Sequence, residues 1–132
     1  MELDNKDRGI VNLLQENCRL TNSELAERVH LSPSSCLRRV QRLEQSGIID
    51  GSVMLVRQDK VGKPTNIFVE ISLGTQHEEA LDQFEKTVRE CPEIMECYLM
   101  SGDFDYLLRV ITRDNDDYVR VHNKLTSLPG VM

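Results

Sequence analysis

The sequence predicts an α+β fold, with a helical first half and a second half that alternates strands and helices. Apolar residues recur at helical spacing up to about residue 45, whereas from Ile67 to Leu73 they recur at every second position. Charge is divided in the same way. Residues 1–60 carry nine Lys/Arg and nine Asp/Glu, and residues 61–132 carry seven Lys/Arg and thirteen Asp/Glu. The whole net charge of −6 therefore lies in the second half, which indicates two parts with different partners.

Size and composition are those of a folded protein without a membrane span. The 132 residues, 39% apolar and 29% charged, suit one domain or two very small ones. No apolar run approaches the roughly 18 residues of a membrane-spanning helix, and the opening MELDNKD does not resemble a secretory signal. We therefore expect a cytoplasmic protein without membrane contact.

The cysteines form no metal-binding or disulfide motif. Cys18, Cys36, Cys91 and Cys97 contain no C-x-x-C pair, and no histidine lies at metal-ligand spacing from them. We expect reduced, mostly buried thiols, and neither a metal nor any other cofactor.

Two short helices are predicted before residue 31. Asp4 is a good N-cap for the first, whose apolar face contains Ile10 and Leu14. Either Thr21 or Asn22 can cap the second. The pair at His30 and Leu31 then interrupts the helical pattern.

A third helix has the clearest start signal in the chain. Ser32 can accept a hydrogen bond from an unpaired backbone N–H. Pro33 at the first helical position costs the helix no hydrogen bond, because the N–H at that position has no partner within the helix. The helix is expected to run to about Gln45, with Gly47 in the left-handed position that follows a helix end. Its inward face is expected to hold Cys36, Leu37, Val40 and Leu43.

After this helix the sequence predicts a wing and then a linker. Asp50-Gly51 is the strongest hairpin signal in the chain, and a hairpin here would complete a winged helix-turn-helix domain over residues 1–60. Gly62 and Pro64 mark residues 61–65 as a linker.

Residues 66–132 predict a ferredoxin-like domain that lacks its closing strand. A strand at residues 67–73 is followed by a helix from Glu78 to Cys91, which Pro92 ends. Two further strands, at 94–100 and 106–112, surround a turn, and a last helix begins near Asp114. The resulting order βαββα is that of a split βαβ fold without its final strand.

The third helix is predicted to read DNA. The second and third predicted helices, joined by a tight turn, form a helix-turn-helix. In this motif the start of the latter helix reaches base edges in the major groove. Arginine can bond guanine bidentately, while other arginines pair with phosphates, and the helix N-terminus itself favours a phosphate. The candidate DNA-binding residues are Ser32, Ser34, Ser35, Arg38, Arg39 and Arg42.

The ordered motifs of the chain resemble the Lrp/AsnC, or feast/famine, transcriptional regulators. The resemblance lies in LDNKDRGIVNLLQEN, RLTNSELAERVHLSPSSCLRRVQRLEQSGIIDG, SGDFDYLLRV and LTSLPGV, which together span nearly the whole chain. It implies that Ser32 to Gln45 bind double-stranded DNA. It also implies that the second domain forms homodimers, and often octamers, and binds a small effector, commonly an amino acid.

The resemblance places the effector near the turn between the last two strands. Gly102 is expected where backbone approaches the ligand or turns sharply, and Asp103 and Asp105 are candidate partners for its ammonium group. Aspartates between strands are also common in plain hairpin turns, where they bond their own backbone. Ser101 and Tyr106 complete the candidate effector-binding set, although Tyr106 also suits the first position of a strand.

Members of this family usually continue past the Leu-Pro-Gly-Val segment, whereas this sequence stops at Met132. The first strand would then keep an open edge, which invites pairing with another chain. We expect either a truncated chain or a partner that covers this edge.

An enzyme and a protein-contact module are the two alternative functions. His30, His77 and His122 lie in no nucleophile, base or metal pattern, and no glycine-rich phosphate loop is present, so we expect no enzyme. The alternative is a sensing and assembly module whose winged helix makes protein contacts. Under the main hypothesis, dimers pair two helix-turn-helix domains on a roughly palindromic site, and an effector biases assembly and so DNA binding.

Overall fold

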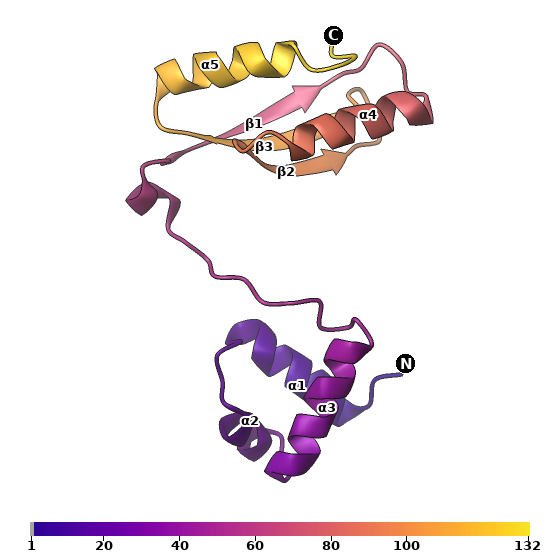
Figure 1. Ribbon diagram of the computed structural model, residues 1–132, viewed down its shortest axis with the longest axis vertical. Coiled ribbons are helices and arrows are strands. Elements are labelled where there is room, and N and C mark those ends of the chain that lie inside the picture. Colours follow the sequence, from indigo (N-terminus) through magenta and orange to yellow (C-terminus); the bar gives the residue numbers. More distant parts are fainter. Residues whose placement is uncertain (1) are drawn as a thin grey trace. The chain divides into compact units, whose positions relative to one another are not determined.

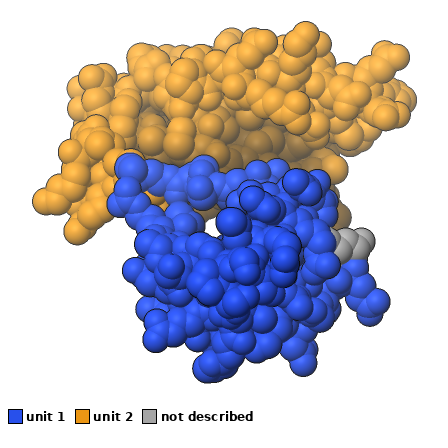
Figure 2. Space-filling model, turned by 60° about the horizontal axis from the view of Figure 1, so that its bottom comes forward, with its two compact units in different colours: residues 1–54 blue, residues 55–132 orange. Residues whose placement is uncertain are grey.

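A computed structural model describes residues 2–132, and the chain divides into two compact units, Met1–Met54 and Leu55–Met132 (Figure 2). Each unit has its own hydrophobic core. The division lies ahead of the predicted domain boundary at residue 60, and that boundary and the 61–65 linker remain predictions. No helix in the described residues is long and apolar enough to cross a membrane.

The first unit consists of helices α1 (Asn5–Glu16), α2 (Asn22–Arg28) and α3 (Pro33–Gln45) (Figure 1). The N-caps are those that the sequence predicts. The side chain of Asp4 accepts from the Asp7 N–H, that of Thr21 from the Glu24 N–H, and that of Ser32 from the Ser35 N–H. Between α2 and α3, His30 adopts a positive φ of 59°, which turns the chain between the helices. The buried core consists of Ile10, Leu25, Ala26, Val29, Cys36 and Leu43.

The predicted hairpin after α3 is wrong. Residues 46–57 contain no strand, and the chain runs on in an extended form (Figure 1). The Ile49 N–H donates to the Leu43 carbonyl at 3.1 Å, and Ile49 packs against the core of the first unit. Too few residues thus remain between the helix end and Asp50 for the first arm of a hairpin, which is at best marginally stable even when complete. Exposed apolar side chains follow, namely Val53, Met54, Leu55 and Val56.

The second unit is a three-stranded antiparallel sheet with two helices. After the short 3₁₀ helix η1 (Gln58–Val61) come β1 (Thr65–Ile71), α4 (Glu78–Arg89), β2 (Ile94–Leu99), β3 (Tyr106–Thr112) and α5 (Asn115–Thr126) (Figure 1). The strand order is β1-β3-β2, as expected for a ferredoxin-like sheet. Both the fold class and the βαββα order that the sequence predicts are confirmed.

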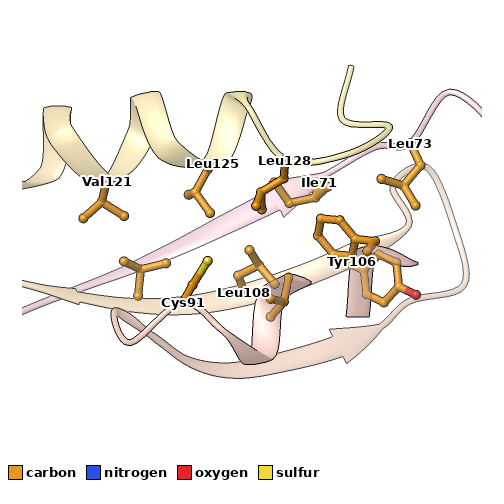
Figure 3. Packing of buried hydrophobic residues seen from close by; sticks show 11 residues of the cluster. Ile71, Leu73, Cys91, Tyr106, Leu108, Val121, Leu125 and Leu128 are labelled. Carbon is orange, nitrogen blue, oxygen red and sulfur yellow. The ribbon is translucent and has the colours of Figure 1, made fainter. Parts of the chain in front are cut away.

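One face of this sheet carries the core (Figure 3). Alternate residues of β3, from Tyr106 through Leu108 and Val110, are buried and share one cluster with Phe84 of α4 and Val121 of α5. Both helices therefore cover the same face, and neither of them covers the other face of the sheet.

The last residues lie beside the continuation of β1. Leu73 and Val131 form an antiparallel bridge, and the Met132 N–H donates to the Ser72 carbonyl at 3.0 Å. The Gly74 N–H donates to the Gly130 carbonyl at 2.9 Å. This is the side of β1 on which a ferredoxin-like sheet adds its final strand.

Candidate DNA interface and effector region

Helix α3 has a buried side and an outward side. Cys36 and Leu43 are fully buried, whereas Ser34, Arg38 and Gln41 are exposed. These exposed residues lie three or four positions apart, and residues at that spacing share one helix face. The predicted inward position of Leu37 is wrong, because 46% of this residue is exposed. At about 100° per residue, Leu37 is turned away from Cys36 toward the outward row.

The first turn of α3 is held by the Ser32 hydroxyl, which accepts from the Ser35 N–H at 3.2 Å. The hydroxyl oxygens of Ser32 and Ser34 lie 3.4 Å apart. Ser32 therefore shapes the helix start, while Ser34 is exposed beside it. Three basic side chains, Arg38, Arg39 and Arg42, line a surface hollow together with Ser35. Such a hollow next to a helix N-terminus has the charge to hold a phosphate.

Two of the three arginines are held by α1. The Arg39 guanidinium donates to Asp4 at 2.7 Å and to Asp7 at 3.0 Å, and Arg42 donates to Asp7 at 3.1 Å. Only 25% of the Arg39 side chain is exposed, so its predicted outward position is corrected, whereas 55% of the Arg42 side chain is exposed. Within residues 2–132, the ion pairs of α3 involve these two arginines and not Arg38.

The carboxylates explain this arrangement. The Asp7 side chain is 1% exposed, and a buried carboxylate is costly unless cations and hydrogen bonds compensate it. Arg39 and Arg42 supply both. The Arg39 hydrogen bond, aided by the Asp7 backbone N–H, lowers the pKa of Asp4 to about 2, and hydrogen bonds to the carboxylates of Asp4 and Asp7 raise the pKa of Arg39. Asp4 and Arg39 therefore stay charged at neutral pH, and the ion pairs fix α3 against α1.

The predicted effector turn lies between β2 and β3. Asp105 joins this turn to the end of β1, because its carboxylate accepts from the Leu73 N–H at 2.8 Å and from Gln76 Nε2 at 3.3 Å. Its own N–H donates to the Ile71 carbonyl at 2.9 Å. Asp105 thus bonds backbone at the distant end of β1 and not the local turn backbone that hairpin chemistry favours, in addition to any role toward a ligand.

The other residues of the turn differ in accessibility. Ser101, Gly102 and Asp103 are exposed, and Gly102 has a φ of 139°, which favours glycine. Apart from its chain neighbours, no atom of residues 2–132 lies within 4 Å of where a Cβ of Gly102 would stand, so space beside this backbone is open. The turn can therefore present its backbone to a small molecule.

The structure corrects the expectation for Tyr106. Its side chain is 1% exposed and its ring lies 4.7 Å from that of Phe84. Its hydroxyl donates to Glu85 Oε1 at 2.7 Å, and burial together with this bond raises its pKa. Tyr106 is a core residue that begins β3, and its side chain is closed to an effector.

Comparisons with known proteins identify the family. Residues 3–50 match the model for a winged helix-turn-helix DNA-binding domain, and residues 66–132 match that for the Lrp/AsnC ligand binding domain. The Leucine-responsive regulatory proteins of Escherichia coli K12 and Klebsiella pneumoniae are each 43% identical to this chain over 131 residues. These matches cover 98% of this chain and 80% of each relative. The chain belongs to the Lrp/AsnC family.

Solved Lrp/AsnC structures have the same fold. A transcriptional regulator from Neisseria meningitidis, crystallised as a complex with L-Met, superimposes with a TM-score of 0.92 at 39% identity and covers 99% of this chain and 85% of its own. An AsnC family regulator from Agrobacterium tumefaciens gives 0.92 at 37% identity, covering 98% and 84%. This Lrp/AsnC protein is a DNA-binding transcriptional regulator with a ligand-binding second domain. DNA binding is thereby favoured over the alternative of an N-terminal domain used for protein contacts.

Sequence reasoning about this Lrp/AsnC chain missed three functional contributors. The sequence predicts Asp4 only as a helix cap, and its spacing does not show that it contacts α3. Gln76, a partner of Asp105, lies in a loop without a motif. A signal for Asp7 was present in principle, since a carboxylate three residues before the apolar Ile10 shares its helix face.

Proposed function

We propose that this regulator inserts α3 into the major groove of its operator, with Arg38 as the principal base-reading side chain. The observation that supports this most is that Arg38 is exposed one turn after Ser34 while the neighbouring Arg39 is held by α1. An arginine free at both edges of its guanidinium can bond guanine O6 and N7 together.

The remaining residues of α3 set the position of the helix on the DNA. Ser34 and Ser35 lie at the helix start, where hydroxyls and backbone N–H groups meet phosphate or base edges. Arg42 pairs with Asp7 on one side and is open to a phosphate on the other. Arg39 acts as a positioning residue that keeps α3 at a fixed angle to α1, and Ser32 fixes the helix start.

We further propose that the effector is an amino acid bound at the turn of residues 101–105. Its ammonium group would pair with Asp103 and Asp105, and its carboxylate would meet the Ser101 hydroxyl and the backbone near Gly102. The L-Met complex of the Neisseria relative supports an amino acid as the chemical class. Binding there would reach β1 through the Asp105–Leu73 hydrogen bond and change assembly, and hence DNA affinity.

We propose a homodimer in the cytoplasm, with octamers as a further stage, in which two α3 helices meet a roughly palindromic site. The uncovered sheet face supports self-association. It carries Phe68, which is 62% exposed, and Tyr98, which is 49% exposed.

The test is fluorescence anisotropy on the full chain, with DNA from upstream of its own gene against a scrambled duplex at two salt concentrations. We expect binding that prefers the native sequence and weakens steeply with salt. Arg38→Ala should lose about 1–3 kcal/mol, roughly fivefold to 150-fold, on the native duplex.

Arg89→Ala, which removes the same charge from an exposed position of α4, is the matched control and should bind normally. Equal affinity of wild type and Arg38→Ala for the native duplex would contradict the assignment of Arg38. Each amino acid is then titrated into the complex, and unchanged affinity and oligomer size with all of them would contradict the effector proposal.

A further inference from the structure

Leu37 is an exposed apolar residue on α3. Among the described helices of the first unit it is the large apolar residue that leaves more than a third of its surface exposed, at 46%. The other apolar residues of α3 point toward the core: Cys36 and Leu43 are buried and Val40 is half-buried. Single exposed leucines are common on protein surfaces, so the exposure of Leu37 carries weight only together with its position on α3.

The position of Leu37 on the helix indicates which kind of partner it would contact. Leu37 lies three residues after Ser34 and four before Gln41, and residues at these spacings are neighbours on a helix surface. Ser34, Arg38 and Gln41 are all exposed. Leu37 therefore lies within the row that faces the groove if α3 docks as proposed, flanked by the cation of Arg38.

The major groove presents one apolar group, the C5-methyl of thymine, and one pair of atoms that suits a glutamine amide, N6 and N7 of adenine. An aliphatic side chain and an amide one turn apart fit this pair of features. The arginines beside them favour a polyanion over an apolar protein surface.

We propose that Leu37 contacts a thymine methyl and Gln41 an adenine, so that each half-site contains A·T pairs next to the guanine read by Arg38. This inference rests on the proposed docking of α3. It adds an apolar contact and an amide contact to the guanine contact proposed for Arg38.

The experiment uses the full chain and duplexes selected from a random pool. In the selected site each thymine is replaced in turn by uracil, which removes only the C5-methyl group, and affinities are measured by anisotropy. For wild type we expect one replacement per half-site to weaken binding about fourfold, the effect of one buried methyl-sized group. Leu37→Ala should bind the thymine duplex about fourfold more weakly and be insensitive to that same replacement.

Gln41 is tested in parallel with purine in place of adenine, which removes the N6 amino group. Gln41→Ala should be insensitive to one purine replacement that weakens wild-type binding. Val119→Ala, which trims an exposed apolar residue of α5, is the control and should respond to every base as wild type does. Circular dichroism confirms that each variant is folded.

The outcomes distinguish failure of the Leu37 contact from failure of α3 docking on DNA. A selected site that wild type and Leu37→Ala bind alike, with equal losses at every uracil, overturns the role of Leu37 and leaves docking by α3 intact. A pool that yields no preferred sequence overturns the docking of α3, and this inference with it.

Discussion

Asp4 and Arg39 form the solvent-side end of the α1–α3 network, so their charges are linked to the stability of the DNA-binding unit. The pKa of Asp4 is about 2 in the folded chain against an ordinary value of 3.8. A carboxyl whose pKa is lowered by folding stabilises the folded state above its unfolded pKa, and that contribution is lost as the pH falls through the folded pKa. The contribution of Asp4 should therefore be complete above about pH 5 and should be lost as the pH falls through about 2.

The variant Asp4→Asn tests this, because asparagine keeps the capping ability and removes the charge. We expect Asp4→Asn to be less stable than wild type at pH 5, with the difference shrinking steadily toward pH 2. Urea unfolding followed by circular dichroism measures it, and Asp50→Asn, at an exposed position, is the control. A stability difference that does not change between pH 5 and pH 2 would rule out the ion pair as its cause.

At the same scale, the sequence distinguishes residue types better than it distinguishes their environments. Arg38, Arg39 and Arg42 look equivalent as a basic cluster, and only the packing of α3 against the buried Asp7 separates one free arginine from two paired ones. Leu37 was misplaced for a related reason. Apolar character predicts burial on average, but the contact surface of a short helix is narrower than its set of apolar residues.

At the scale of elements, β3 forms the centre of the second unit, because it pairs with both other strands and its inner side chains contact both helices. Leu108 is fully buried in the middle of β3. Leu108→Ala should lower the free energy of unfolding of this unit by about 2–5 kcal/mol, the usual cost of emptying such a site. Val119→Ala, at an exposed position of α5, should cost clearly less. Urea unfolding followed by circular dichroism compares them, and equal losses would contradict the central place of Leu108 in this core.

Elements with strong local signals were predictable and those that depend on pairing partners were less so. The N-caps at Asp4, Thr21 and Ser32 each mark the start of a helix, because the capping bonds are made within a few residues. The predicted hairpin at Asp50-Gly51 is absent although its turn chemistry is favourable. The end of α3 and the packing of Ile49 leave too few residues for the first strand of a hairpin. The 101–105 turn was located from sequence, but the bond from Leu73 to Asp105 joins residues 32 positions apart and is invisible in a local pattern.

For the whole molecule, charge and exposed apolar surface have separate locations. The acidic excess lies in residues 61–132, which leaves residues 1–60, with no net charge, to meet DNA with locally arranged arginines. Arg109 at the centre of the uncovered sheet face is bonded to Glu96 at 2.9 Å and to Asn66 at 3.0 Å, so its charge is paired within the face. A face with a paired central charge and exposed apolar side chains suits a second copy of the chain better than it suits solvent.

This face should therefore control the oligomeric state. Phe68 pairs with Arg109 across the β1–β3 ladder, and Leu107 and Ile111 lie on the same side of β3. Phe68→Glu would place a charge in a closely packed interface, so sedimentation should change from dimers or larger species to monomers at micromolar concentration. Val119→Glu puts the same charge on an exposed position of α5 and should leave the dimer intact. Because two linked helix-turn-helix units gain affinity from effective concentration, the Phe68→Glu monomer should also bind a palindromic duplex far more weakly while binding a single half-site normally. A dimeric Phe68→Glu, or one that still prefers the palindrome, would place the interface elsewhere.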